Sequence, residues 1–135
     1  MKFLIIDKSP DIRSSIKRII DPDITGHITI SASNYDEAFF NLYSINPDYI
    51  IIDPESLNGH GMMLLKSSLA LLPSSRIFLF TELSTESIRE KFRELGLKNI
   101  YSKSTEAEKF IKELSMVLTS SIEPEIINTL LETTN

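Results

Sequence analysis

The sequence contains no cysteine, and none of its apolar runs approaches the ~20 residues that a membrane-spanning helix needs. The absence of cysteine excludes a disulfide framework, a zinc site built from thiolates and a thiol nucleophile. The apolar stretch near the N-terminus, residues 3–6, is too short for a signal peptide. We therefore expect a soluble, cytoplasmic protein that does not contact a membrane.

Positive charge is also scarce. The chain has 14 basic and 19 acidic residues, which gives a net charge of −5. Because the neutralisation of nucleic-acid phosphates requires clustered lysine and arginine, we expect no direct nucleic-acid partner. Gly59 and Gly61 do not form a phosphate-binding loop, since no Gly-x-Gly-x-x-Gly or Gly-Lys-Ser/Thr pattern opens a helix. His27 and His60 are isolated, so neither is expected to bind a metal.

Apolar runs alternate with segments of helical periodicity along the 135 residues, a length that suits one domain. The runs at residues 3–6 and 49–52 lack polar alternation, which is typical of parallel strands that are covered on both faces, and residues 27–32 form a weaker strand. In the first helical segment Ile12, Ile16, Ile19 and Ile20 form one apolar stripe, and Pro10 suits the first turn. The predicted strands cover residues 3–6, 27–32, 49–52, 77–80 and 99–102, and the predicted helices cover residues 10–20, 36–45, 62–72, 85–95 and 106–118.

Five strand–helix units in succession predict right-handed crossovers and a parallel sheet with helices on both faces. The expected fold is α/β: a doubly wound, five-stranded parallel sheet of order 2-1-3-4-5 in a flavodoxin-like three-layer sandwich. We assign residues 1–120 to this domain and residues 121–135 to a C-terminal tail or short helix, which carries Ile126, Ile127, Leu130 and Leu131. The cluster Met62-Met63-Leu64-Leu65 is expected to belong to the core.

Four polar residues directly follow apolar runs: Asp7, Asp53, Thr81 and Lys103. Because functional residues of such sheets lie just past the carboxyl ends of the strands, we expect these side chains to converge. A carboxylate can act as a nucleophile, and an ammonium and a hydroxyl can stabilise the charge of a transferred phosphoryl group. A second carboxylate can help to hold Mg²⁺. The set therefore suits phosphoryl transfer to an aspartate.

These four residues, together with Gly61 eight positions after Asp53, resemble the CheY-like receiver domains of bacterial two-component response regulators over about residues 2–118. The resemblance implies a signalling role in a phosphorelay rather than an enzyme. It implies that Asp53 accepts a phosphoryl group from a sensor histidine kinase or phosphotransfer protein. It also implies that Thr81 is the switch hydroxyl and that Lys103 pairs with Asp53 or its phosphoryl group.

The same resemblance implies an Mg²⁺ site formed by Asp7, Asp53 and the backbone carbonyl of Glu55. The family usually has a second acid after the first strand, where this chain has Lys8. The formal charges of Asp7, Lys8, Asp53 and Lys103 therefore sum to zero. Each unit-charge interaction at ~4 Å is worth about 4 kcal/mol at an effective dielectric constant near 20, so Mg²⁺ binding should be weak or absent. Other departures from the family pattern are Leu57, Glu82, Ile100 and Ser104.

Lys8 suggests a specific hypothesis: its ammonium reaches Asp7 and Asp53 and takes over part of the role of Mg²⁺. The second reading of the sequence is accordingly an atypical pseudo-receiver, a protein-interaction module without Mg²⁺-dependent phosphorylation. A distant third reading is a phosphatase of the haloacid-dehalogenase type, because Asp53-Pro54-Glu55 resembles its nucleophile motif. That reading conflicts with the order of the motifs, since the nucleophile of that family follows the first strand, and the late acidic pair is missing.

The resemblance also implies an interaction surface. Receivers commonly signal through the face formed by their fourth helix, fifth strand and fifth helix, here residues 85–95, 99–102 and 106–118. We expect a homodimer or another protein partner there, with Tyr101 taking part. Ile100 occupies the position of the usual switch aromatic residue, and Tyr101, one place along the strand, should point to the opposite face of the sheet.

Overall fold

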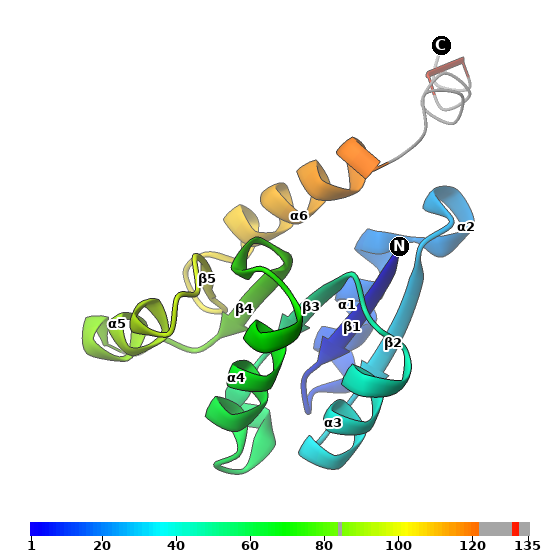
Figure 1. The fold of residues 1–135 in the computed structure, drawn as a ribbon. Helices are drawn as coiled ribbons and strands as arrows, with labels where there is room; N and C mark the ends of the chain where they lie inside the picture. Colours follow the sequence, from blue (N-terminus) through cyan, green and yellow to red (C-terminus); the bar gives the residue numbers. More distant parts are fainter. Residues whose placement is uncertain (84, 122–130, 133–135) are drawn as a thin grey trace.

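The computed structural model describes residues 1–83, 85–121 and 131–132. Its centre is a five-stranded parallel sheet in the order β2-β1-β3-β4-β5, which confirms the predicted flavodoxin-like topology (Figure 1). The strands are β1 (Lys2–Ile6), β2 (Ile28–Ala32), β3 (Tyr49–Ile52), β4 (Ile77–Thr81) and β5 (Asn99–Ser102).

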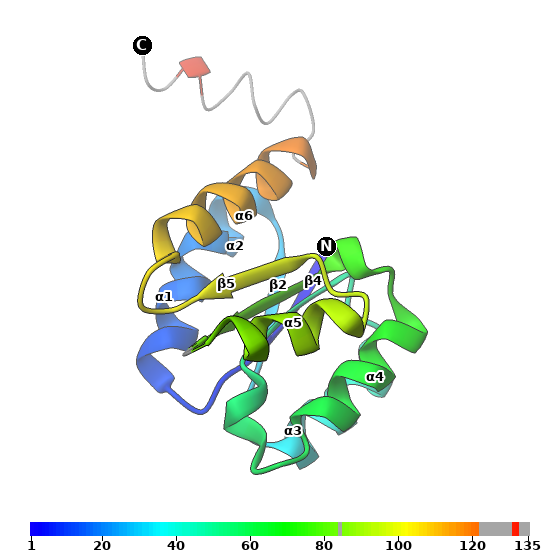
Figure 2. The same ribbon diagram turned by 90° about the vertical axis from the view of Figure 1, so that its left-hand side faces the viewer.

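Helices cover both faces of the sheet (Figure 2). On one face lie α1 (Pro10–Ile20) and α6 (Ala107–Ser121), and on the other lie α3 (Tyr35–Ser44), α4 (Gly61–Leu71) and α5 (Glu86–Glu94). Three short elements were not predicted: α2 (Pro22–Thr25) and the 3₁₀ helices η1 (Pro54–Leu57) and η2 (Ser74–Arg76). Each has three or four residues, too few to show an apolar stripe in the sequence.

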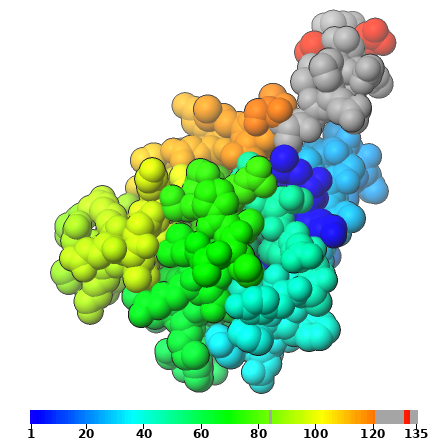
Figure 3. Space-filling view, viewed as in Figure 1, coloured from blue at the N-terminus to red at the C-terminus, as the bar shows by residue number. Residues whose placement is uncertain are grey.

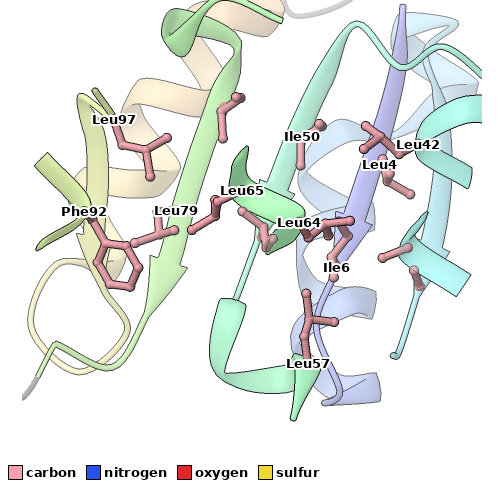
Figure 4. Close-up of a cluster of buried hydrophobic side chains, with 14 of the residues drawn as sticks. Leu4, Ile6, Leu42, Ile50, Leu57, Leu64, Leu65, Leu79, Phe92 and Leu97 are labelled. Atoms are coloured by element: carbon pink, nitrogen blue, oxygen red, sulfur yellow. The ribbon is translucent and has the colours of Figure 1, made fainter. Parts of the chain in front are cut away.

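The sheet separates two clusters of buried side chains, as expected for strands that are covered on both faces. Alternate residues of each strand supply them: Leu4 and Ile6 face α3 and α4, while Phe3 and Ile5 face α1 and α6. Figure 4 shows the cluster on the side of α3, α4 and α5, whose labelled residues are Leu4, Ile6, Leu42, Ile50, Leu57, Leu64, Leu65, Leu79, Phe92 and Leu97. Each fully buried Leu, Ile or Phe side chain stabilises the fold by about 1.5–3 kcal/mol.

The prediction that Met62-Met63-Leu64-Leu65 belongs to the core is half wrong. Leu64 and Leu65 are buried, whereas Met62 and Met63 are exposed. All four lie in the helix α4, where successive side chains are ~100° apart, so four in a row cannot all face the sheet.

Most of the C-terminal tail, including Ile126, Ile127 and Leu130, lies outside the described residues, so the expected tail or short helix over residues 121–135 stays a prediction. The helix α6 runs to Ser121, three residues beyond the predicted end. None of the helices in the described part of the chain has the length and apolar character that crossing a bilayer requires.

Gly61, the first residue of α4, packs directly against the loop that follows β3. A Cβ atom at this position would lie 2.5 Å from the carbonyl oxygen of Pro54 and 2.6 Å from its Cβ. Pro54 directly follows Asp53, so the close approach of Gly61 fixes the path of the chain next to a candidate site residue.

We predict that Gly61→Ala lowers the free energy of unfolding by about 1–3 kcal/mol, because backbone atoms of Pro54 cannot move aside as the end of a flexible side chain could. Lys66→Ala, at an exposed position of the same helix, is the matched control and should change stability little. Urea unfolding monitored by circular dichroism measures both. Equal stability of Gly61→Ala and the parent protein would contradict this packing.

Candidate functional site

The four polar residues selected from the sequence meet at the carboxyl edge of the sheet. Lys103 lies between two carboxylates, with its Nζ 2.7 Å from Oδ2 of Asp7 and 2.7 Å from Oδ2 of Asp53. Thr81 Oγ1 donates a hydrogen bond of 2.6 Å to Oδ1 of Asp53. Asp7, Asp53 and Thr81 are buried, and Lys103 is partly exposed.

The sheet order places these side chains. Because β3 lies between β1 and β4, Asp53 lies between Asp7 and Thr81. Backbone hydrogen bonds continue past the strands and fix the heights of the two loops: Asp53 N–H donates to the carbonyl of Ile6 at 2.8 Å, and Lys103 N–H donates to the carbonyl of Thr81 at 2.9 Å. Lys103 follows β5, two strands from β3, and its long side chain spans that distance.

Every carboxylate oxygen of the aspartate pair already accepts a hydrogen bond or faces an ammonium group. Oδ1 of Asp53 accepts the Glu55 N–H at 3.0 Å as well as the Thr81 hydroxyl, so Asp53 also caps η1. Oδ1 of Asp7 accepts the Ser9 N–H at 2.8 Å. The two remaining Oδ2 atoms share Lys103. The two negative charges are therefore held close together by one cation rather than repelling each other across an empty gap.

The pKa of Lys103 is raised above its ordinary value. Burial lowers this pKa, but hydrogen bonds to Asp53 and Asp7, and the negative charges of both, outweigh the effect of burial. Lys103 is consequently a stable cation at neutral pH. It neutralises half of the formal charge of the aspartate pair and offers a donor directed at Asp53.

The hypothesis that the Lys8 ammonium reaches Asp7 and Asp53 is wrong for this structure. Lys8 is exposed, and among the described residues no ion pair joins its ammonium to a carboxylate. Its backbone N–H donates to the Oγ of Ser56 at 2.8 Å, which fixes the loop but not the side chain. Lys103 already occupies the position between the carboxylates. Lys8 nevertheless lines the same surface opening as Asp53, Thr81 and Lys103, so its positive charge acts on the site from the rim.

The residues present do not fit a strong Mg²⁺ site. Magnesium requires several oxygen ligands in near-octahedral geometry. Within residues 1–83, 85–121 and 131–132, no group of three or more acidic, histidine or cysteine side chains is arranged to hold a metal. A metal at Asp7 and Asp53, even with the backbone carbonyl of Glu55, would compete with Lys103 for both carboxylates and face Lys8 at the opening.

Sequence reasoning missed several residues that support the site. Arg13 donates to the carbonyl of Asp7 at 2.6 Å, and buried Ser56 holds the backbone of Lys8. Both lie on neighbouring elements, α1 and η1, and neither has a spacing signal that sets it apart from an ordinary surface residue.

The expected part of Tyr101 in a partner surface does not agree with its burial. Its ring points to the opposite face from Ile100, as predicted, but it is only 2% exposed and packs in the core beneath α6. Its hydroxyl donates to the carboxylate of Glu113. A residue buried in this way cannot form part of a docking surface without unpacking of the helix.

We predict that Lys103→Met lowers the free energy of unfolding at pH 7 by roughly 1–3 kcal/mol. This is less than the ~3–5 kcal/mol typical of a fully buried pair, because water reaches this edge of the sheet. Since the folded-state pKa of Lys103 is raised, its contribution is fully present below the ordinary value of 10.5 and is lost as the pH rises through the folded value. Urea unfolding at several pH values should give a constant difference between pH 7 and pH 9. A loss no larger than that of Lys66→Met, at an exposed lysine of α4, would contradict the bridge.

Comparisons with known proteins agree with the geometry. No family model matches the chain, and no curated protein matches its sequence. Many solved structures are nonetheless similar, and those reported below are receiver domains or response regulators.

A two-component response regulator from Clostridium difficile is 21% identical, with a TM-score of 0.72 over 88% of this chain and 96% of that one. The BeF₃-activated N-terminal receiver domain of RstA from Klebsiella pneumoniae is 18% identical, with a TM-score of 0.71 over 87% of this chain and 98% of that one. A Burkholderia pseudomallei response regulator with a phosphorylated aspartic acid, a calcium ion and citrate is 19% identical, with a TM-score of 0.67 over 98% of this chain and 72% of that one. The chain therefore has the CheY-like fold of response-regulator receiver domains.

Proposed function

We propose that the protein is a receiver domain of a two-component phosphorelay and accepts a phosphoryl group on Asp53 from a sensor histidine kinase or phosphotransfer protein. The observation that carries the proposal is the arrangement around the Asp53 carboxylate. One oxygen contacts the Lys103 ammonium and the other accepts the hydroxyl of Thr81, and both partners lie at the opening to solvent. The receiver-domain fold supports the same role.

In the proposed reaction an oxygen of Asp53 forms a bond to the phosphorus of a phosphohistidine donor. The bond between phosphorus and the donor nitrogen breaks, and the departing imidazole takes up a proton from solvent. The product is an acyl phosphate, a mixed anhydride of the Asp53 carboxylate, while Lys103 offsets the added negative charge and Thr81 donates to a phosphoryl oxygen. Lys103 must turn from the aspartate oxygens towards the phosphoryl group for this to happen, since its Nζ now contacts both carboxylates.

A pseudo-receiver is the second candidate, and the two lysines favour it. Lys103 holds both aspartates and Lys8 adds a second positive charge at the opening, so the aspartate pair has cationic partners without Mg²⁺. In this role the domain would bind a protein partner in one fixed state. A phosphatase of the haloacid-dehalogenase type is not favoured, because its nucleophile follows the first strand, whereas Asp53 follows β3.

The proposed partner surface for signalling is the face of α5, β5 and α6, without the buried Tyr101. The helix α5 carries six charged residues among its nine, which suits a polar protein contact. Arg89 ties this helix to its neighbours by donating to the carbonyl of Ile100 at 3.2 Å and by pairing with Glu106.

We predict that incubation with acetyl phosphate adds one phosphoryl group to the protein and none to Asp53→Asn. Intact-protein mass spectrometry with and without Mg²⁺ measures the product. Phosphorylation of the parent protein alone supports the receiver. No phosphorylation in either condition, by acetyl phosphate or by purified histidine kinases, contradicts the receiver and leaves the pseudo-receiver.

We also predict that Lys8→Asp strengthens Mg²⁺ binding by at least tenfold. The change replaces a repulsive charge with an attractive one at the opening that Asp53 lines. Isothermal titration of Mg²⁺ into both proteins measures the effect. Lys66→Asp makes the same change of charge on α4 and should leave binding unaltered. Equal, tight binding by the parent protein and Lys8→Asp would show that Lys8 has no influence on the site.

A further inference from the structure

The exposed aromatic side chains of the described residues are concentrated on one helix. Phe39, Phe40 and Tyr43, all on α3, are 43%, 68% and 50% exposed. The helix packs on the sheet through the smaller side chains Ala38 and Leu42 and directs its largest ones outward. A surface helix of a monomer usually turns its largest apolar side chains towards the core, whereas here water contacts them.

The neighbouring helix α4 extends this apolar surface. Helices α3 and α4 lie side by side on the same face of the sheet (Figures 1 and 3). Met63 and Leu71 of α4 are 57% and 50% exposed. Met62 lies on the opposite flank of α4, where it lines a groove with Ile88 and Phe92. We call Phe39, Phe40, Tyr43, Met63 and Leu71 the α3–α4 surface.

Charge is scarce on these two helices. They carry three charged residues, Asp36, Glu37 and Lys66. The helix α5 covers the same face of the sheet and carries six among nine residues. Depletion of charge and enrichment in Phe, Tyr and Met are features of the cores of protein–protein interfaces.

Two of the three exposed aromatic rings, those of Phe39 and Tyr43, are held in place before any partner arrives. Tyr35, Phe39 and Tyr43 lie one turn apart on α3, with ring centroids 5.8 Å and 4.9 Å apart along the row. The ring of His60, at the start of α4, lies 5.0 Å from that of Tyr35 and continues the row towards the next helix. Contacts between neighbouring rings restrict their rotamers, so less side-chain entropy is lost on binding.

We propose that the α3–α4 surface is the interface of a symmetric homodimer, in which it packs against the same surface of a second copy. At ~150–250 Å² for a whole aromatic side chain, the exposed fractions of the five residues correspond to roughly 500 Å² of apolar surface. A stable interface buries about 800 Å² per partner, so this surface forms its core and a polar rim supplies the remainder. The commonest soluble oligomers are two-fold dimers with such self-complementary interfaces.

The scarcity of charge on the α3–α4 surface favours a second copy of this chain over a positively charged partner. Each chain has a net charge of −5, so two copies repel each other over most of their surfaces. They can approach closely where charge is scarce, and the α3–α4 surface meets that condition. A partner recognised by electrostatic attraction would instead be expected on a strongly charged face such as that of α5. Asp53 is not one of the residues of the α3–α4 surface.

Sedimentation velocity over a range of concentrations tests the proposal. We expect the parent protein to be dimeric at micromolar concentrations. Phe40→Glu and Phe40→Lys, each at the most exposed aromatic position, should each raise the dissociation constant more than tenfold, because like charges would meet across the two-fold axis. Met116→Glu, at an exposed position of α6 on the other proposed partner surface, should leave the dimer intact.

Mixing the two variants supplies a second, independent readout. In an isologous interface the carboxylate introduced by Phe40→Glu in one copy meets the ammonium introduced by Phe40→Lys in the other, so the mixture should form heterodimers where neither variant alone dimerises. A monomeric parent protein, a dimer that Phe40→Glu leaves unchanged, or a mixture that stays monomeric would each overturn the proposal. A cooperative thermal unfolding transition of the monomeric variants, measured by circular dichroism, shows that they are folded.

Discussion

The ammonium group of Lys103, between Asp7 and Asp53, is the contact on which the functional edge of the sheet depends. Its Nζ is 2.7 Å from an oxygen of each carboxylate. The three residues follow β1, β3 and β5, so one cation ties together loops from three strands. Without it two buried carboxylates would face each other with no cation between them, which is unfavourable. The same contact offsets half of the formal charge of the aspartate pair, and with Thr81 it leaves both oxygens of Asp53 with a polar partner.

This constraint gives Lys103 two competing duties. It stabilises the resting site by holding both aspartates, and it must release them if a phosphoryl group is to be stabilised on Asp53. In a pocket with more carboxylates a divalent cation could help Lys103 to hold the two aspartates. Here Lys8 stands at the opening where an acid would have helped to attract that cation. Of the two proposed functions, the phosphoacceptor requires that Lys103 can leave Asp7, whereas the fixed interaction module requires that it stays.

The sequence was sufficient to predict the fold because its strands have clear ends. The sequence predicts the strands Tyr49–Ile52 and Asn99–Ser102 to the residue, since a charged residue, Asp53 or Lys103, directly follows each of them. Convergence of Asp53 and Lys103 followed from the parallel sheet alone. The direction of the Lys8 side chain could not be predicted, because residue type and spacing do not say whether Lys8 or Lys103 lies between the two aspartates.

The surface was harder to read from the sequence. Tyr101 was assigned to a docking face, yet helix α6 covers it and Glu113 accepts its hydroxyl. The exposure of Phe39 and Phe40 was not foreseen, because adjacent aromatic residues in a helix look like core residues until the sheet shows which flank is covered. Burial depends on the packing of elements far apart in the chain, and periodicity within one element does not contain that information.

Nuclear magnetic resonance of the lysine ammonium groups tests the central claim most directly. In metal-free protein near neutral pH, the bridge predicts that the Nζ resonance of Lys103 is distinct from those of the other lysines and slow to exchange with water. It also predicts a shift of that resonance in both Asp7→Asn and Asp53→Asn, since each removes one of its two anionic partners. A Lys103 resonance that coincides with those of exposed lysines, or that responds to neither substitution, would contradict the account.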